Sequence, residues 1–97
     1  MEKVPNDKNL NYLRQAIDEV DEQLIVLISK RMKLVAKIGE YKARNDIPPL
    51  DENRWDQVIN SRISKAEMLG LKGEIVRQIW ELMHSYALDL EENISKE

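Results

Sequence analysis

Residues 10–41 read LNYLRQAIDEVDEQLIVLISKRMKLVAKIGEY, and this stretch decides the fold. Its apolar side chains recur in steps of three and four residues, which places them along one face of an α-helix. They are Leu10, Leu13, Ile17, Val20, Leu24, Leu27, Leu34, Ile38 and Tyr41, with Arg31 in the one remaining position of the series. The pattern predicts one long helix over roughly residues 9–44. Asp7 or Asn9 can cap its start, and the prolines after Ile47 end it.

Two shorter helices are predicted in the rest of the chain. Asp51 can cap the first of them, and Gly70 can end it in a left-handed conformation. The second begins near Lys72 or Gly73 and frays over residues 93–97. Their apolar faces carry Trp55, Val58, Ile59, Ile63, Ala66 and Leu69, and then Ile75, Val76, Ile79, Trp80, Leu82, Met83, Tyr86, Ala87 and Leu90. No stretch alternates with period two for long enough to predict a strand, so we expect an all-α fold.

The predicted long helix exceeds what one small domain can cover. About 35 residues at 1.5 Å each span about 50 Å, whereas a domain of about 100 residues has a radius of gyration near 13 Å. The two shorter helices can shield only part of its apolar face, so the remainder needs a second copy. We predict a single domain over residues 1–97, with its core at about 10–92 and frayed ends, that forms a homodimer through the long helices. Gly39 is the one weak point at which that helix could bend instead.

The composition excludes several classes of function. The 97 residues are 42% hydrophobic and 34% charged, which is typical of a folded domain. A formal net charge of −3 and no local run of basic residues argue against binding of nucleic acid or an anionic membrane. The absence of cysteine removes disulfides, thiolate metal sites and thiol nucleophiles. Residues 1–9 are polar and no apolar window reaches the length of a membrane span, so we expect a soluble cytoplasmic protein.

Arg31 is the charged residue that does not fit the apolar face. A buried guanidinium needs an anionic partner, so an internal ion pair or a side chain that reaches solvent is the simplest explanation for Arg31 alone. Lys42 changes this interpretation, because eleven residues at 100° each bring it within about 20° of the same helix face and about 16 Å along the axis. Arg14 lies about 25 Å from Arg31, too far to share a small ligand within one chain. In an antiparallel dimer it could meet the partner's Arg31.

Glu91 adds a carboxyl group to these cations. Steps of four, three and four residues place it on one face of the last helix with Trp80, His84 and Ala87. The residues alone therefore predict a dry helical cavity that binds a small dianion. His84 is the only histidine, and the serines have no base at a suitable spacing, so we expect no metal, no cofactor and no nucleophile.

Over roughly residues 10–92 the chain resembles the all-helical chorismate mutases. The matching pieces are Leu13-Arg14, Asp21 with Leu24 and Leu27, Arg31, Gly39-Glu40-Tyr41-Lys42, and Pro48-Pro49-Leu50-Asp51 leading to Arg54. The resemblance implies an intertwined homodimer in which each active site takes its first arginine from one chain and its other groups from the partner. It also implies the (3,3) Claisen rearrangement of chorismate to prephenate in aromatic amino-acid biosynthesis, without a nucleophile or a general base.

The resemblance assigns roles to five residues. The partner's Arg14 and Arg31 would bind the two carboxylates of the substrate, and Lys42 would donate to the ether oxygen and a carboxylate. Asp51 stands where the loop approaches the ring hydroxyl. Glu91 stands where many members have a glutamine that faces the ether oxygen. Because an ionised glutamate cannot donate a hydrogen bond, Glu91 would have to carry a proton, and turnover should fall as the pH rises.

Two positions depart from the usual family pattern. Trp55 stands where some members have a glutamate or glutamine that binds the ring hydroxyl, and Ala87 stands where a serine or threonine is usual. The same fold therefore leaves open an isochorismate-pyruvate lyase or a 4-amino-4-deoxychorismate mutase. The competing class is a helical dimerisation module without enzymatic activity, in which Arg31 is only salt-bridged.

Overall fold

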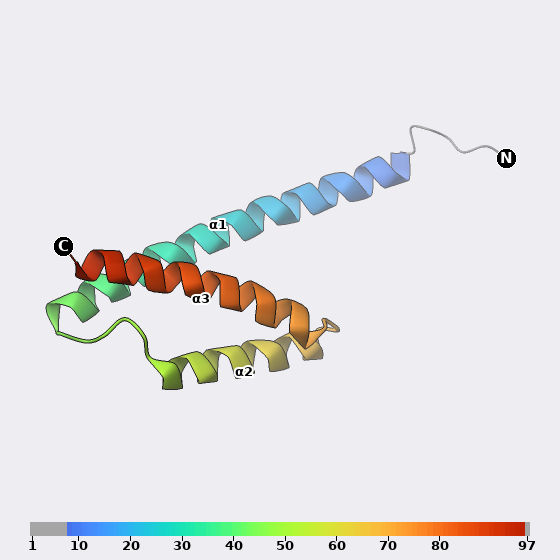
Figure 1. Ribbon diagram of the computed structural model, residues 1–97. Helices are drawn as coiled ribbons and strands as arrows, with labels where there is room; N and C mark the ends of the chain where they lie inside the picture. The colour runs from blue at the N-terminus through green and yellow to red at the C-terminus, as the bar shows by residue number, and fades with distance from the viewer. Residues whose placement is uncertain (1–7, 97) are drawn as a thin grey trace. The chain divides into compact units, whose positions relative to one another are not determined.

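The computed structural model describes residues 8–96, and its regular structure is helical throughout (Figure 1). Helix α1 spans Lys8–Arg44, α2 spans Glu52–Met68 and α3 spans Gly73–Ser95. No strand occurs within the described residues, which confirms the all-α prediction. Asp7, one of the two caps predicted for the first helix, lies outside them.

The chain divides into two compact units, the first ending at Lys33 and the second beginning at Leu34. The described part of the first unit is a single stretch of α1. Its predicted apolar face is open to solvent in one chain, with exposed fractions from 43% at Leu10 to 59% at Ile17. An apolar face of this length on one helix has no core of its own to pack against.

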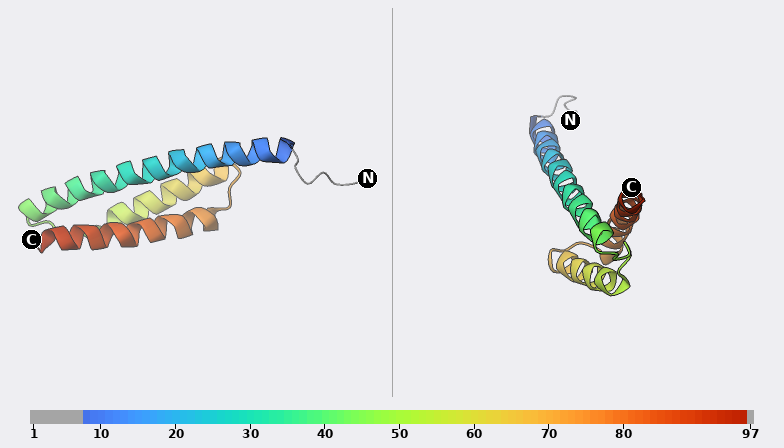
Figure 2. Two further views of the ribbon diagram at one scale, coloured as in Figure 1. Left: turned by 90° about the horizontal axis from the view of Figure 1, so that it is seen from above. Right: turned by 90° about the vertical axis from the view of Figure 1, so that its left-hand side faces the viewer.

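The second unit contains the last turns of α1 together with α2 and α3. Helices α2 and α3 lie side by side and run in opposite directions, joined by residues 69–72 (Figures 1 and 2; Figure 2 gives two further views). The buried apolar side chains between and around them are Val58, Ile59, Ala66, Val76 and Ala87. Leu69 and Leu82 belong to the predicted apolar faces but are 68% and 74% exposed, so only part of each face is covered in one chain.

The connection from α1 to α2 is fixed by local hydrogen bonds at both ends. Asp46 has a φ of 55°, and the amide of Ile47 donates to the carbonyl of Lys42 at 2.9 Å, which closes the last turn of α1. At the start of α2, the Asp51 side chain accepts a hydrogen bond from the amide of Arg54 at 3.0 Å. The predicted cap at Asp51 is therefore confirmed.

The connection from α2 to α3 depends on two glycines. Gly70 has a φ of 84°, and the amide of Leu71 donates to the carbonyl of Ala66 at 2.9 Å, as expected for a helix that ends in a left-handed residue. At Gly73 a Cβ atom would lie 2.8 Å from Cγ2 of Ile63, so a side chain there would push the start of α3 away from α2.

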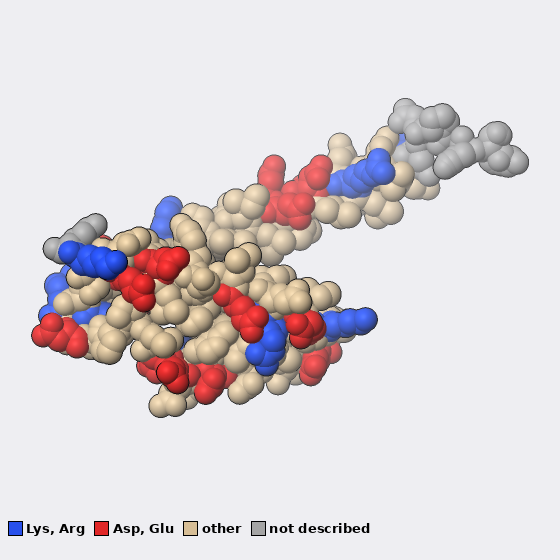
Figure 3. Space-filling view, in the orientation of Figure 1, with Lys and Arg blue, Asp and Glu red and all other residues tan. Residues whose placement is uncertain are grey.

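Helix α3 continues to Ser95, two residues beyond the start of the range 93–97 in which fraying is predicted. The helical hydrogen-bond pattern persists to this end, because the amide of Lys96 donates to the carbonyl of Glu92 at 3.2 Å. The described helices include none that is long and apolar enough to cross a membrane. On the face drawn in Figure 3, lysines and arginines are interspersed with acidic side chains.

Candidate functional site

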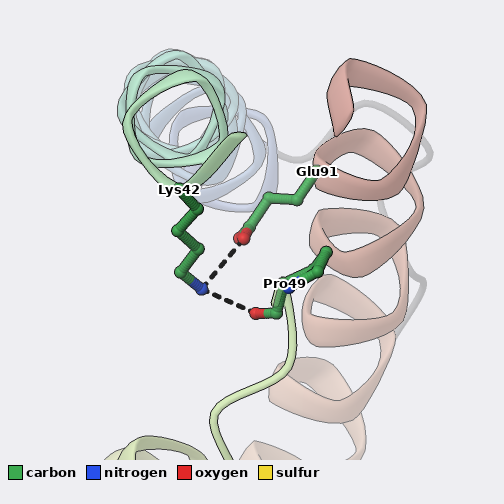
Figure 4. A network of polar contacts seen from close by, with 3 residues as sticks. All are labelled: Lys42, Pro49 and Glu91. Carbon is green, nitrogen blue, oxygen red and sulfur yellow. Dashed lines mark hydrogen bonds and ion pairs between the residues drawn. The ribbon is translucent and has the colours of Figure 1, made fainter. Parts of the chain in front are cut away.

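Lys42 lies in the last turn of α1 and extends toward α3 (Figure 4). Its Nζ atom donates to Oε1 of Glu91 at 3.0 Å and to the carbonyl oxygen of Pro49 at 2.6 Å. The side chains of Lys42 and Glu91 are only 19% and 10% exposed. The loop that follows α1 and the C-terminal half of α3 thus converge on one ammonium group at the end of α1.

Gly39 makes this convergence possible. It is the buried residue of α1, and a Cβ atom there would lie 3.1 Å from Cγ of Glu91 and 3.2 Å from Cδ1 of Ile94. The same Cβ would lie 3.3 Å from the Cα of Glu91, so α1 and α3 approach at backbone contact distance. Gly39 precedes Lys42 by almost one helical turn. The missing side chain therefore sets the separation at which the Glu91 carboxylate reaches Lys42.

The Lys42–Glu91 pair is poorly explained as a device for stability. Burying two charges costs several kcal/mol of hydration each, and an apolar pair of similar volume often stabilises a fold at least as well. An ammonium group also has three donors, of which the contacts with Glu91 and Pro49 use two. The pair therefore provides a fixed, partly dehydrated cation with a donor left for a ligand oxygen.

Asp51 has a structural task at the edge of this cluster. It follows Pro49 by two residues, and its carboxylate caps α2 through the amide of Arg54. Asp51 and Arg54 are both exposed. The structure thus shows the Asp51 side chain bound to the backbone at the start of α2, and its predicted approach to a ring hydroxyl stays a prediction.

A second cluster was missed at the sequence level. The rings of Trp55 on α2 and His84 on α3 are stacked, with centroids 4.0 Å apart and planes 11° from parallel. Both residues are half-buried. Helical spacing placed His84 on the Glu91 face of α3, but no spacing within one helix could pair it with Trp55 on another. The only available signal was that two flat side chains occupy apolar faces of neighbouring helices.

The two predicted arginines lie in the first unit, on α1. Arg14 is exposed and Arg31 is half-buried. The remaining predicted residues, Lys42, Asp51 and Glu91, lie in the second unit, where the structure brings Lys42 and Glu91 into contact. Among residues 8–96 there is no group of three or more histidine, aspartate and glutamate side chains that could hold a metal ion.

Comparison with known proteins identifies related sequences. The family described as chorismate mutase type II matches residues 13–92. The T-protein of Enterobacter agglomerans is 37% identical over 70 residues, which are 72% of this chain and 19% of that protein. The secreted chorismate mutase of Yersinia pestis is 37% identical over 57 residues, 59% of this chain and 31% of its own length.

A longer match is found with the bifunctional chorismate mutase/prephenate dehydratase of Aquifex aeolicus (strain VF5). It is 30% identical over 90 residues, which are 90% of this chain and 25% of that protein. The chain thus spans between 19% and 31% of the length of these three relatives.

Proposed function

Because the chain belongs to the chorismate mutase type II family, we propose that it converts chorismate to prephenate, a step of aromatic amino-acid biosynthesis. The observation that carries this proposal in the structure is the Lys42–Glu91 pair. It lies within the matched residues 13–92, and it supplies a fixed cation where α1 and α3 meet.

The reaction requires no covalent bond between the substrate and the protein. One ether C–O bond breaks while one C–C bond forms within the same molecule, so no nucleophile, water or redox partner takes part. The enzyme has to hold the compact conformer of the substrate and stabilise negative charge that develops on the ether oxygen. A preorganised ammonium group is suited to the second task, because it needs no rearrangement when the charge appears.

We propose that Lys42 donates the hydrogen bond to the ether oxygen. In the ligand-free chain Glu91 and the Pro49 carbonyl hold Nζ in position, and a substrate carboxylate or ether oxygen would take the remaining donor. Glu91 is the second group proposed at the ether oxygen, and it can donate there only when it carries a proton. Asp51 lies beside the same loop and is proposed to approach the ring hydroxyl.

We propose that Arg31 and the partner's Arg14 bind the two carboxylates in a homodimer. The apolar face of the first unit supports association, because its residues from Leu10 to Leu27 are about half exposed in a single chain. A hollow of about 330 Å³ in the second unit adds further uncovered surface. It is lined by Arg62, Lys65, Ala66, Leu69, Leu71, Val76 and Trp80. A helix from a second copy would cover both surfaces.

The activity is tested by following loss of chorismate and appearance of prephenate. Parallel reactions with isochorismate, assayed for pyruvate, and with the 4-amino analogue of chorismate identify the preferred substrate. We expect prephenate from chorismate, and we expect Lys42→Met to abolish its formation. Lys37→Met is the matched control, since Lys37 lies on α1 five residues earlier and is exposed. Pyruvate from isochorismate without prephenate from chorismate would overturn the assignment.

The shared site is tested by mixing two inactive variants, Arg14→Ala and Arg31→Ala. If each site takes these arginines from different chains, a mixed dimer contains one site with both arginines intact. Random mixing then restores about a quarter of the wild-type activity, because half of the dimers are mixed and half of their sites are complete. Activity that stays at the level of the separate variants would show that both arginines act within one chain.

A further inference from the structure

We infer that Trp55 is the surface against which the substrate ring packs, and that His84 is a positioning residue that holds the indole in place. This inference rests on the proposed function. It assigns a role in substrate specificity to two aromatic residues in addition to the charged residues of the site.

The stack is neither a core contact nor a free surface contact. Its ring planes differ by only 11° at a centroid separation of 4.0 Å, so one face of each ring is covered by the other. Both residues are nevertheless half-buried, whereas the core residues Val58 and Ile59 next to Trp55 on α2 are buried. Part of the surface of the two rings therefore stays accessible to a ligand in one chain.

Helical spacing directs the stack toward the Lys42 cluster, that is, Lys42 with its partners Pro49 and Glu91. On α3, Glu91 follows His84 by seven residues, which is within about 20° of two full turns and about 10 Å along the axis. On α2, Trp55 follows the Asp51 cap by four residues, about one turn. The stack is thus separated from residues at the Lys42 cluster by about one turn on α2 and two turns on α3.

The residue between the two clusters on α3 has a small side chain. Ala87 lies between His84 and Glu91 on α3 and is 7% exposed. Its methyl group fills little of the distance between the imidazole and the carboxylate. A molecule bound to Lys42 could therefore extend along α3 toward the indole.

The chemistry of the proposed substrate fits this arrangement. Its carboxylates and ether oxygen are polar and would lie at the cationic end, while the carbon skeleton of its six-membered ring is unsaturated and mostly apolar. An indole offers a large flat apolar face, and an imidazole stacked on its other side restricts its rotation. Indole has a single donor and no acceptor, so Trp55 would recognise the shape of the ring and not accept a hydrogen bond from its hydroxyl.

The first test compares steady-state constants for chorismate in four variants. Trp55→Ala should raise KM about ten-fold while changing kcat less. Loss of the packing between the indole and the substrate ring corresponds to a roughly ten-fold lower affinity. His84→Ala should raise KM by a smaller factor, and His84→Phe should restore it, because a phenyl ring can stack in the same place. The matched control is Trp80→Phe on α3, which should leave KM within about two-fold of the wild type.

The second test reads the indole directly. In the Trp80→Phe variant Trp55 is the only tryptophan, and its fluorescence emission should change on titration with prephenate. In Trp55→Phe, which leaves only Trp80, the emission should not respond. If Trp55→Ala fails to fold by circular dichroism, this titration decides the matter alone.

The outcomes distinguish failure of the roles of Trp55 and His84 from failure of the proposed function. Two outcomes would overturn the role of Trp55 only, provided that turnover is normal. One is an unchanged KM in a folded Trp55→Ala variant, and the other is an indole emission in Trp80→Phe that does not change with prephenate. Failure of His84→Phe to restore KM would overturn the positioning role of His84. Absence of prephenate formation by the unmodified chain would overturn the proposed function and this inference together.

Discussion

Lys42→Met should destabilise the second unit markedly, and the structure allows the size of the effect to be worked out. The substitution removes the donor that Glu91 contacts at 3.0 Å and Pro49 at 2.6 Å. The Glu91 side chain is 10% exposed, so little water can replace the lost ammonium. Removal of one partner of a buried ion pair costs about 3–5 kcal/mol. Since Lys42 itself is 19% exposed, we expect about 2–3 kcal/mol, or a fall in Tm on the order of 10–20 °C.

The double variant Lys42→Met/Glu91→Leu should recover most of this loss. It replaces both charges by apolar groups of similar volume, and such replacements are often neutral or stabilising. We expect its free energy of unfolding to lie within about 1 kcal/mol of the wild type. Turnover of chorismate should stay absent, because the donor to the ether oxygen is missing. The second substitution would then restore stability without restoring activity.

The assay is urea denaturation followed by circular dichroism, together with prephenate formation by each variant. Protein concentration is kept constant, since association contributes to the measured stability of a dimer. Lys37→Met again serves as the control for loss of a lysine from α1. A double variant that is no more stable than Lys42→Met alone would show that the charged pair itself supports the fold. Turnover that survives in the double variant would refute the catalytic assignment.

Three further substitutions test individual features of the site. Glu91→Gln should keep turnover, because an amide nitrogen can donate to the ether oxygen while the amide oxygen still accepts from Lys42; loss of turnover in a folded variant would contradict the role proposed for Glu91. Asp51→Ala should lower stability by about 1 kcal/mol through loss of the hydrogen bond from the Arg54 amide, and Asp51→Asn should retain most of it, as measured by Tm. Gly39→Ala should gain up to about 1 kcal/mol of helix propensity and yet lower kcat, because its Cβ would lie 3.1 Å from Cγ of Glu91. An undiminished kcat in this variant would show that the spacing of α1 and α3 is not critical.

The boundaries of the helices were the most predictable part of the fold. Asp51 and Gly70 act through their own side chain or backbone on residues within one turn, so the sequence contains all that is needed to predict their effect. The end of α1 before the prolines follows from the same local rules. Exposure was predicted less well, because Leu69 and Leu82 have helical periodicity but no covering element in one chain.

The site was only partly predictable for a related reason. Lys42 and Glu91 were predicted to share one cavity, but the sequence did not predict their direct contact, which joins positions 49 residues apart. It depends on the distance between α1 and α3, which Gly39 sets by having no side chain. Periodicity within one helix gives directions and not distances between helices. For the same reason the flat side chains of Trp55 and His84 on neighbouring helices were not enough to predict that they stack.

The 49-residue separation of Lys42 and Glu91 also bears on how the protein folds. Helices α2 and α3 are joined by residues 69–72 alone, so their pairing closes a short loop and should form early. Docking of the end of α1 on α3 closes a much longer segment and carries a larger entropic cost. On dilution from denaturant, helical signal should therefore return before enzymatic activity does. Catalytic activity would be the last property to appear during refolding. Lys42 and Glu91 lie on α1 and α3, and these are the two helices whose docking we expect to be slowest.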